Sequence, residues 1–149
     1  IYTPDVVVFK DDDRMQLLPE GQRMSLDVIT VAAPNLRPNP SNRWNPEPSK
    51  AIAVKPMELL AIHKKRAKRL FFIAKANGAE VLVLGAFGCG AFQNPPEVVA
   101  RAYKEVLAEF EYDFDTVEFA VYCPKRDQTA NPSGNNYAVF RRVLGSKKR

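Results

Sequence analysis

Cysteine and histidine are scarce in this chain, and their scarcity excludes several kinds of site. Two cysteines, Cys89 and Cys123, are too few for a disulfide framework, and His63 is the single histidine. The cysteines also lack the spacing and partner histidines of a zinc site, so we expect neither a metal nor another cofactor. This cysteine usage is typical of the reducing cytoplasm, which is the expected location.

Long apolar runs and a leader sequence are also missing. No stretch is long enough to cross a bilayer, so no membrane partner is expected. The chain opens IYTPDVVVFK, without an initiator Met or the order of a signal peptide, and this opening suggests a fragment lacking its amino-terminal part. With 149 residues, 46% hydrophobic and 26% charged, we expect residues 1–149 to form a single soluble domain.

Positive charge exceeds negative charge by a modest amount, with 22 Lys and Arg against 17 Asp and Glu. A basic excess raises the possibility of nucleic-acid binding. Most of it lies in residues 63–69 (HKKRAKR) and 146–149 (SKKR), where no aromatic residues interleave to stack on bases. A solvated helix face explains such a run, so nucleic acid is not an expected partner.

Short apolar segments predict the strands. They lie at residues 5–9, 26–33, 81–84 and 116–122. The second of them, LDVITVAA, is apolar enough to indicate a strand buried on both faces. It is followed by a Pro-rich segment, residues 35–55, which is typical of a functional flap or a disordered excursion.

The first predicted helix begins at Pro56 and ends at Asn77-Gly78, a pair suited to a left-handed C-cap. His63 could be a catalytic base, but no nucleophile or orienting carboxylate lies near it in sequence. A histidine packed at the edge of the core is therefore favoured. The apolar face at helical spacing comprises Leu59, Leu60, His63, Ala67, Leu70, Phe71 and Ala74.

The second predicted helix has Asn94 as its N-cap, Pro95 as its first residue and Glu97 in a capping-box position. It continues to about Phe110, and a last helix covers residues 137–144. The inner face of the second helix comprises Val99, Ala102, Tyr103, Val106 and Phe110.

Strands that alternate with amphipathic helices imply an α/β sandwich, with helices on both faces of a largely parallel sheet. Ligands of such sheets bind beyond the carboxyl ends of the strands. The segment EVLVLGAFGCGAFQNPP, residues 80–96, places a glycine-spaced loop there, between a strand and the start of a helix. Small residues let a backbone approach an anion, and the helix N-terminus supplies a favourable field, so this loop indicates a phosphate site.

The loop differs from two well-known phosphate motifs. It has no Gly-Lys-Ser/Thr ending, which excludes a Walker A loop, and it lies too late in the chain for the GxGxxG of a dinucleotide fold. What remains is a loop suited to a diphosphate, with the aromatic ring of Phe92 close enough to orient a ribose.

The sequence LGAFGCGAFQNPPEVVARAY resembles the second phosphate-binding loop and following helix of the macrodomain fold, and in particular the microbial-type poly(ADP-ribose) glycohydrolase family. The segments IYTPDVVVFKDD, DVITVAAPN, FAVYCP and NNYAVFRRVL also resemble that family, in the same order, so the resemblance covers nearly the whole chain. It implies a three-layer α/β/α macrodomain-like sandwich with a mixed, largely parallel sheet.

The resemblance also implies an ADP-ribose site. Backbone N–H groups of the loop from Gly88 to Phe92 would hold the diphosphate, Phe92 would orient the distal ribose, and the segment around Asn136 would lie near the adenine. Cys89 would shape the loop and would not act as a nucleophile. The implied binding residues are Gly85, Phe87, Gly88, Cys89, Gly90, Ala91, Phe92, Asn136, Tyr137 and Phe140.

The chain departs from the family in one respect that concerns catalysis. Members that hydrolyse poly(ADP-ribose) carry a GGG motif and then Gln-Glu-Glu, whose glutamate is the general acid, and this sequence contains neither. In the family both motifs precede the segment that matches Ile1. We therefore expect no catalytic residue here and interpret the chain as the carboxyl-terminal portion of an ADP-ribose hydrolase. A non-catalytic ADP-ribose-binding module is the alternative. Expected partners are ADP-ribose or an ADP-ribosylated macromolecule, and the missing amino-terminal segment as a separate chain.

Overall fold

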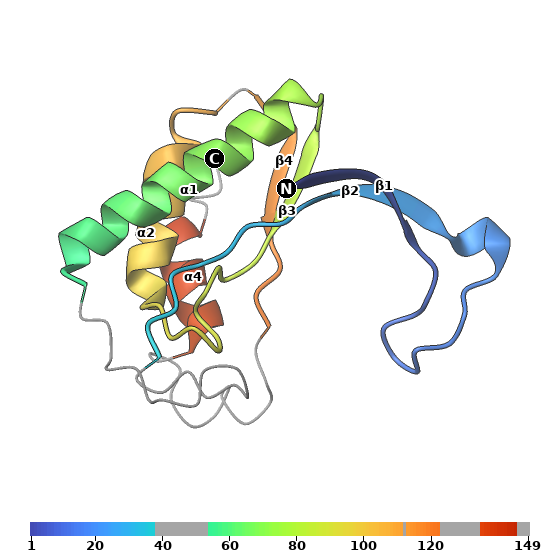
Figure 1. Cartoon of the computed structure of the whole chain (residues 1–149), viewed down its shortest axis with the longest axis horizontal. Helices are drawn as coiled ribbons and strands as arrows, with labels where there is room; N and C mark the ends of the chain where they lie inside the picture. The colour runs from blue at the N-terminus through green and yellow to red at the C-terminus, as the bar shows by residue number, and fades with distance from the viewer. Residues whose placement is uncertain (38–53, 112, 123–134, 146–149) are drawn as a thin grey trace. The chain divides into compact units, whose positions relative to one another are not determined.

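The computed structural model of the chain describes residues 1–37, 54–111, 113–122 and 135–145. Most of the Pro-rich segment 35–55 and the whole of the loop that contains Cys123 therefore lie outside the described residues. The chain divides into two compact units, Ile1–Val31 and Ala32–Arg149, and each is described by itself. Figure 1 shows their elements in chain order.

The first unit is an antiparallel pair of strands, β1 (Tyr2–Val8) and β2 (Met24–Ile29). The connection between the two strands contains a short 3₁₀ turn, η1 (Glu20–Gln22). The pairing is interrupted by a bulge at Asp5, which has a φ of 55°. The Asp27 carboxylate stabilises this bulge, because it accepts hydrogen bonds from the Tyr2 hydroxyl at 2.5 Å and the Asp5 N–H at 3.0 Å.

The prediction of a strand at 26–33 buried on both faces is wrong. β2 ends at Ile29, it pairs with β1 alone within the described residues, and the Leu26 side chain is 42% exposed. A continuous apolar run is compatible with a buried parallel strand, but periodicity does not reveal which partners a strand has.

α1 (Pro56–Ala76) begins and ends where its sequence signals place it. Pro56 is the first helical residue, and Gly78 follows the Asn77 cap with a φ of 72°, as a left-handed C-cap requires. The seven residues of the predicted apolar face are the seven that the structure buries in this helix. No helix in the described part of the chain is both long and apolar enough to cross a bilayer.

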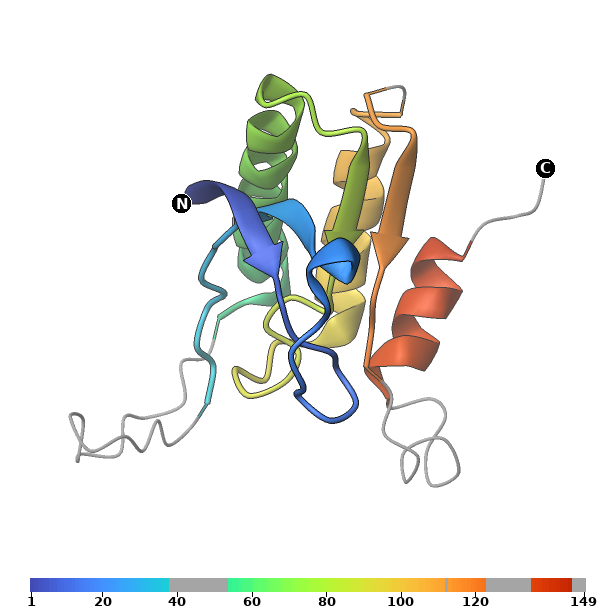
Figure 2. The ribbon, with the colours of Figure 1, turned by 90° about the vertical axis from the view of Figure 1, so that its right-hand side faces the viewer.

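β3 (Val81–Leu84) and β4 (Thr116–Phe119) form a parallel pair in which Val81 lies opposite Thr116. α2 (Pro96–Leu107) connects them, and in Figure 2 it lies behind the pair together with α1. The strands alternate, so that one face packs on the helices while Val83, on the other face, is 67% exposed. The residues on the packed face are Leu82, Leu84, Val117 and Phe119.

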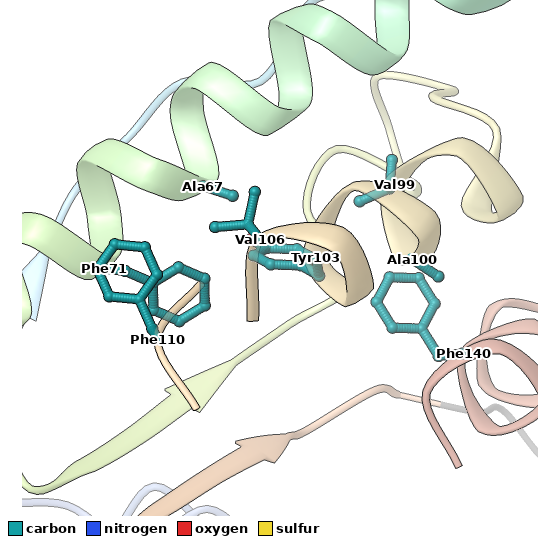
Figure 3. Packing of buried hydrophobic residues seen from close by; sticks show 8 residues of the cluster. All are labelled: Ala67, Phe71, Val99, Ala100, Tyr103, Val106, Phe110 and Phe140. Carbon is teal, nitrogen blue, oxygen red and sulfur yellow. The ribbon is translucent and has the colours of Figure 1, made fainter. Parts of the chain in front are cut away.

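The core of the second unit lies where α1, α2 and α4 (Asn136–Leu144) meet the parallel pair, and Figure 3 shows its buried side chains. Phe71 of α1 and both Val99 and Val106 of α2 are fully buried. α4 adds Phe140, and the Asn135 side chain begins that helix by accepting a hydrogen bond from the Ala138 N–H at 2.6 Å. A parallel pair joined by a helix and covered by helices confirms the α/β class.

The start of α2 differs from its prediction. Pro96, not Pro95, is the first helical residue, Pro95 is the N-cap in an extended conformation, and the helix ends at Leu107. The reason is steric, because a residue that precedes proline is disfavoured in the helical region. Glu97 forms an ion pair with Arg142 of α4 and no capping box, and Asn94 has another role.

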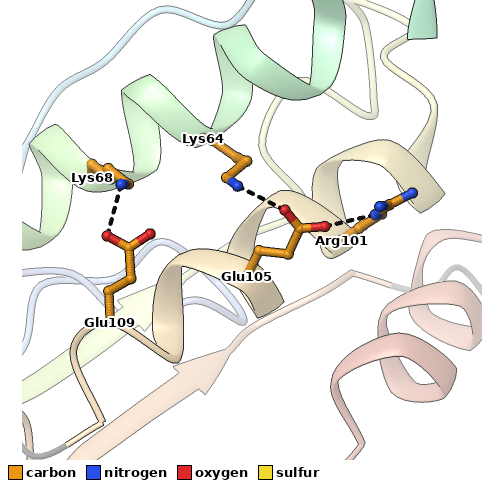
Figure 4. A network of polar contacts seen from close by, with 5 residues as sticks. All are labelled: Lys64, Lys68, Arg101, Glu105 and Glu109. Atoms are coloured by element: carbon orange, nitrogen blue, oxygen red, sulfur yellow. Dashed lines mark hydrogen bonds and ion pairs between the residues drawn. The ribbon is translucent and has the colours of Figure 1, made fainter. Parts of the chain in front are cut away.

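Ion pairs join α1 to α2 and to the segment that follows α2, as Figure 4 shows for two of them. This ion-pair ladder consists of Lys64–Glu105 at 2.8 Å, Lys68–Glu109 at 2.7 Å and Lys75–Asp113 at 2.5 Å. Hydrogen bonds from Lys64 and then Arg101 lower the pKa of Glu105. Carboxylates therefore pair with Lys64 and Lys68 of the basic stretch 63–69, which agrees with the interpretation of that stretch as a helix face.

Candidate ligand-binding site

The loop between β3 and α2, residues 85–95, is built from tight turns that leave several donors unused. The N–H groups of Phe87, Cys89, Gln93 and Asn94 donate to carbonyl oxygens within the loop, at 2.9 to 3.0 Å. Between residues 88 and 92, four N–H groups have no acceptor in the described part of the chain. They belong to Gly88, Gly90, Ala91 and Phe92.

These four donors fall within the span, Gly88 to Phe92, that the family resemblance assigns to the diphosphate. Backbone N–H groups that converge in a glycine-rich turn form an anion-binding concavity. One member of the span differs, because the Cys89 N–H is already bonded to the Ala86 carbonyl at 3.0 Å. The geometry therefore leaves the other four N–H groups of this span without an acceptor among the described residues.

Gly88 has to be glycine for two independent reasons. Its φ is 74°, which is the left-handed region. A Cβ at this position would also lie 2.5 Å from the Ala33 Cβ and 2.6 Å from the Asn94 Nδ2. Gly90 differs, because a Cβ there would meet nothing within 4 Å, so the space on that side of its backbone is open.

Asn94 is the buried centre of the loop, with 2% of its surface exposed. Its side-chain Nδ2 donates to the carbonyl oxygens of Pro34 at 2.7 Å and Gly88 at 3.0 Å, with a longer contact of 3.4 Å to that of Phe92. Its Oδ1 lies 2.9 Å from the Nε2 of His63. Sequence reasoning missed this role, because the position before two prolines favours the simpler assignment as a helix cap.

His63 is buried on α1 with 2% of its surface exposed, as expected of a histidine that packs against the core. The edge of its ring faces Phe87, with 5.9 Å between ring centroids. Burial lowers the pKa of His63, Arg66 lowers it further, and the hydrogen bond with Asn94 opposes both. The neutral imidazole is therefore the form that the fold favours.

This lowered pKa predicts that acid destabilises the fold through His63. The unfolded chain takes up the proton near pH 6.5 and the folded chain only at lower pH, so between these two values the unfolded state binds more protons. The contribution of His63 to the free energy of unfolding should therefore be fully present above pH 6.5. It should decrease as the pH falls below 6.5, by at most about 1.4 kcal/mol per pH unit. Urea denaturation of the wild type from pH 5 to pH 8 measures the effect. His63→Gln, which cannot titrate, should flatten that part of the profile, and an unchanged profile would contradict the assignment.

Phe92 lies in the loop and is held there by contacts with the segment that follows residue 31. Its carbonyl accepts a hydrogen bond from the Leu36 N–H at 3.0 Å, and the guanidinium carbon of Arg37 lies 5.6 Å from its ring centroid. The Asn35 side chain fixes Arg37 in turn, by accepting from its N–H at 3.2 Å and its Nε at 3.3 Å. Sequence reasoning identified Phe92 but not Arg37, which brings positive charge beside the loop.

Cys89 has the environment of an inert thiol. Burial raises the pKa of its thiol to about 12, so the thiolate is a negligible fraction at neutral pH. Its side chain lies 3.7 Å from the Phe87 carbonyl. The structure therefore agrees with a residue that shapes the loop and does not react.

The predicted residues of α4 are divided between the loop, the surface and the core. The Asn136 side chain reaches the loop, with its Nδ2 3.5 Å from the Cys89 carbonyl. Tyr137 is 44% exposed. Phe140 is 2% exposed and packs on Phe119, with 5.8 Å between ring centroids, so its ring belongs to the core.

Comparisons with solved structures place this geometry among known proteins. No protein-family model and no curated protein matches the chain. The poly(ADP-ribose) glycohydrolase of Deinococcus radiodurans in complex with ADP-ribose is 33% identical over 96% of this chain and 51% of its own, with a TM-score of 0.72. The enzyme of the same name from Thermomonospora curvata is 30% identical over 95% of this chain and 46% of its own, with a TM-score of 0.74. The chain thus spans about half the length of the structures that it matches. Over that half, its fold is similar to the macrodomain-like α/β fold of poly(ADP-ribose) glycohydrolase.

Proposed function

We propose that this chain is the ADP-ribose-binding portion of a hydrolase similar to poly(ADP-ribose) glycohydrolase. The observation that carries the proposal is the set of four loop N–H groups without an acceptor in the described residues, from Gly88 to Phe92. They lie between β3 and α2, where a macrodomain of this type is expected to hold a diphosphate. The similar Deinococcus radiodurans structure is a complex with ADP-ribose.

The electrostatics of the loop favour a diphosphate over a neutral ligand. Donors to an anion form charge-assisted hydrogen bonds, which are about twice as strong as neutral ones. The N-terminus of α2, which follows the loop, and the guanidinium of Arg37, which lies over the Phe92 ring, add positive potential near the loop. The openness at Gly90 leaves space for phosphate oxygens to approach the backbone.

Cleavage of the glycosidic bond requires a group that this chain does not supply. A carboxylic acid has to protonate the leaving oxygen as the oxocarbenium-like centre forms. The Gln-Glu-Glu motif that provides it in the family is absent from the sequence. We propose that the acid comes from outside these 149 residues and that this chain holds and orients the ADP-ribose.

A non-catalytic ADP-ribose-binding module is the second candidate, and the missing acid motif favours it. Two measurements separate the candidates. Calorimetry with ADP-ribose tests binding, and an assay on ADP-ribosylated protein tests release. The assay is run on the chain alone and on the chain mixed with the amino-terminal segment that is proposed to carry the Gln-Glu-Glu motif. Release only in the mixture supports the hydrolase, and binding without release in either sample supports the module. A chain that is folded but does not bind ADP-ribose contradicts both.

The partners and location follow from the same proposal. An amino-terminal segment that packs as a separate chain would supply the acid, and an ADP-ribosylated macromolecule would supply the ligand. The free thiol of Cys89 is compatible with the reducing cytoplasm. Co-purification of the two segments from one lysate tests the first point.

Replacement of Phe92 should weaken ADP-ribose binding without abolishing it. Phe92→Ala removes an aromatic surface against which a ribose can be oriented, and the expected loss is roughly 1 to 3 kcal/mol of binding free energy. Calorimetry measures the loss. Phe9→Ala is a matched control, because Phe9 is half exposed and carries Lys10 at 5.8 Å from its ring, as Phe92 carries Arg37. Equal affinities of both variants and the wild type would exclude Phe92 from the site.

A further inference from the structure

We infer that His63 is a positioning residue for the ligand-binding loop. It donates the hydrogen bond that orients the Asn94 amide. That amide in turn holds the loop in the conformation in which its free N–H groups are available to a ligand. This inference rests on the proposed function for the identity of the ligand. It assigns a role to a buried histidine that is remote from the loop in sequence. The contact crosses 31 positions of the chain.

The orientation of the Asn94 amide is determined by its surroundings. One end of the amide faces carbonyl oxygens of Pro34, Gly88 and Phe92, and the other end faces His63. A carbonyl oxygen can only accept, so the end that faces three of them has to be the NH₂ group. The reversed amide would place four acceptors against one another in a buried site.

The protonation of His63 follows from that orientation. With the NH₂ group turned to the carbonyl oxygens, the Asn94 Oδ1 faces the His63 Nε2 at 2.9 Å. An amide oxygen has no proton to give, so Nε2 has to carry it. Because burial lowers the pKa of His63, the ring is neutral near pH 7. A neutral ring with a proton on Nε2 has none on Nδ1, which fixes a single tautomer.

The anchored carbonyl groups enclose the functional span of the loop. Gly88 and Phe92, whose carbonyl oxygens contact the Asn94 amide, are the first and last residues of the span with free donors. The third carbonyl, from Pro34, ties the segment before Arg37 to the same amide. One buried side chain therefore fixes both ends of the donor set and the segment that covers Phe92. His63 donates to the Asn94 Oδ1, which is the atom of the amide that does not contact these carbonyl oxygens.

A packing role alone would have a different signature. Phe71 and Ala67 are also buried on α1, but their side chains contain no polar atom that could hydrogen-bond to the loop. If His63 only fills space, any residue of similar volume replaces it. If it acts through its donor, only a residue with an N–H at the position of Nε2 replaces it. Gln carries such a group at the end of its side chain, and Phe does not.

The first experiment needs no variant, because His63 is the single histidine of the chain. The ¹⁵N chemical shifts of its two ring nitrogens at pH 8 report the tautomer directly. We expect a protonated Nε2 and an unprotonated Nδ1, with the Nε2 proton protected from exchange with water. The opposite tautomer, or a rapidly exchanging ring, would overturn the inference. This result stands even if a variant fails to fold.

The second experiment compares His63→Phe and His63→Gln in the 149-residue chain. Calorimetry with ADP-ribose should give a dissociation constant about tenfold higher for His63→Phe, and within about threefold of the wild type for His63→Gln, because one buried hydrogen bond is at stake. Amide hydrogen exchange over residues 85–95 should be faster in His63→Phe and unchanged in His63→Gln. Equal behaviour of the two variants, in either direction, would overturn the inference.

The two proposals can fail separately. If the wild type is folded and does not bind ADP-ribose, the proposed function is wrong. The tautomer and the exchange rates of the loop still test the role of His63, because neither measurement uses the ligand. If the wild type binds and His63→Phe binds equally well with the same loop protection, the role of His63 is wrong and the proposed function stands.

Discussion

Gly90→Val is expected to abolish measurable ADP-ribose binding while the fold remains intact. A Cβ at Gly90 meets nothing within 4 Å, and the residue does not have a positive φ, so valine is accommodated by the protein itself. Its methyl groups would occupy the open space beside this backbone and should hinder a phosphate from reaching the free N–H groups of Gly90 and Ala91. Two lost charge-assisted hydrogen bonds, at about 1.5 to 3 kcal/mol each, predict a dissociation constant raised at least about 100-fold.

The measurement is calorimetry with ADP-ribose, together with a thermal denaturation curve for each variant. Gly21→Val is the matched control, because Gly21 also has nothing within 4 Å of its Cβ position and lies in the 3₁₀ turn of the first unit. It should bind like the wild type. A folded Gly90→Val variant with wild-type affinity would show that the diphosphate does not approach this part of the backbone.

Gly88→Ala is expected to give the largest loss of stability among the single substitutions of the loop. The left-handed backbone at Gly88 costs a non-glycine residue about 1 to 2 kcal/mol. The added methyl would lie 2.5 Å from the Ala33 Cβ and 2.6 Å from the Asn94 Nδ2, so buried atoms have to move, which costs about a further 1 to 3 kcal/mol. The free energy of unfolding, from urea denaturation, should fall by roughly 2 to 5 kcal/mol.

Gly78→Ala separates the two contributions. Gly78 has nearly the same φ, 72°, but a Cβ there meets nothing within 4 Å. It should therefore show the backbone cost alone, about 1 to 2 kcal/mol. If Gly88→Ala costs no more than Gly78→Ala, the close packing of Gly88 against Asn94 is not what the distances indicate.

Helix faces in this chain could be predicted from sequence because the determining signals are local. Pro56, Asn77 and Gly78 mark the ends of α1, and the spacing of its apolar residues marks the buried face. Phe110 shows the limit of such signals, since it is buried as predicted but lies beyond the end of α2 at Leu107. Periodicity identifies which residues are buried more reliably than it identifies helix ends.

The centre of the site could not be predicted because its contacts are distant in sequence. Asn94 has the sequence context of a helix cap, and only the fold brings it against Pro34 and His63. Arg37 lies in a Pro-rich segment with no periodic signal, yet its position over Phe92 depends on a loop more than fifty residues away. Glycine spacing locates the loop, whereas long-range hydrogen bonds determine its shape.

Local sequence signals also did not predict which strands pair with one another. LDVITVAA has the composition of a buried parallel strand, and its register against β1 is antiparallel. The ion-pair ladder is a second example, because HKKRAKR contains no information about Glu105 of α2 and Glu109 just beyond it, which pair with its lysines. In both cases the missing information is which element lies beside which.

The arrangement of α1, β3, α2 and β4 has a consequence for how the chain folds. These four elements are consecutive, from Pro56 to Phe119, and they pack on one another to form most of the core. Only short loops have to close before they meet, so the entropy lost in bringing them together is small. A stretch of this kind can reach its native arrangement early and cooperatively. The loop with the free donors lies inside this stretch together with Asn94 and His63, so this part of the anion site would form with it, and Pro34 and Arg37 would join from outside the stretch.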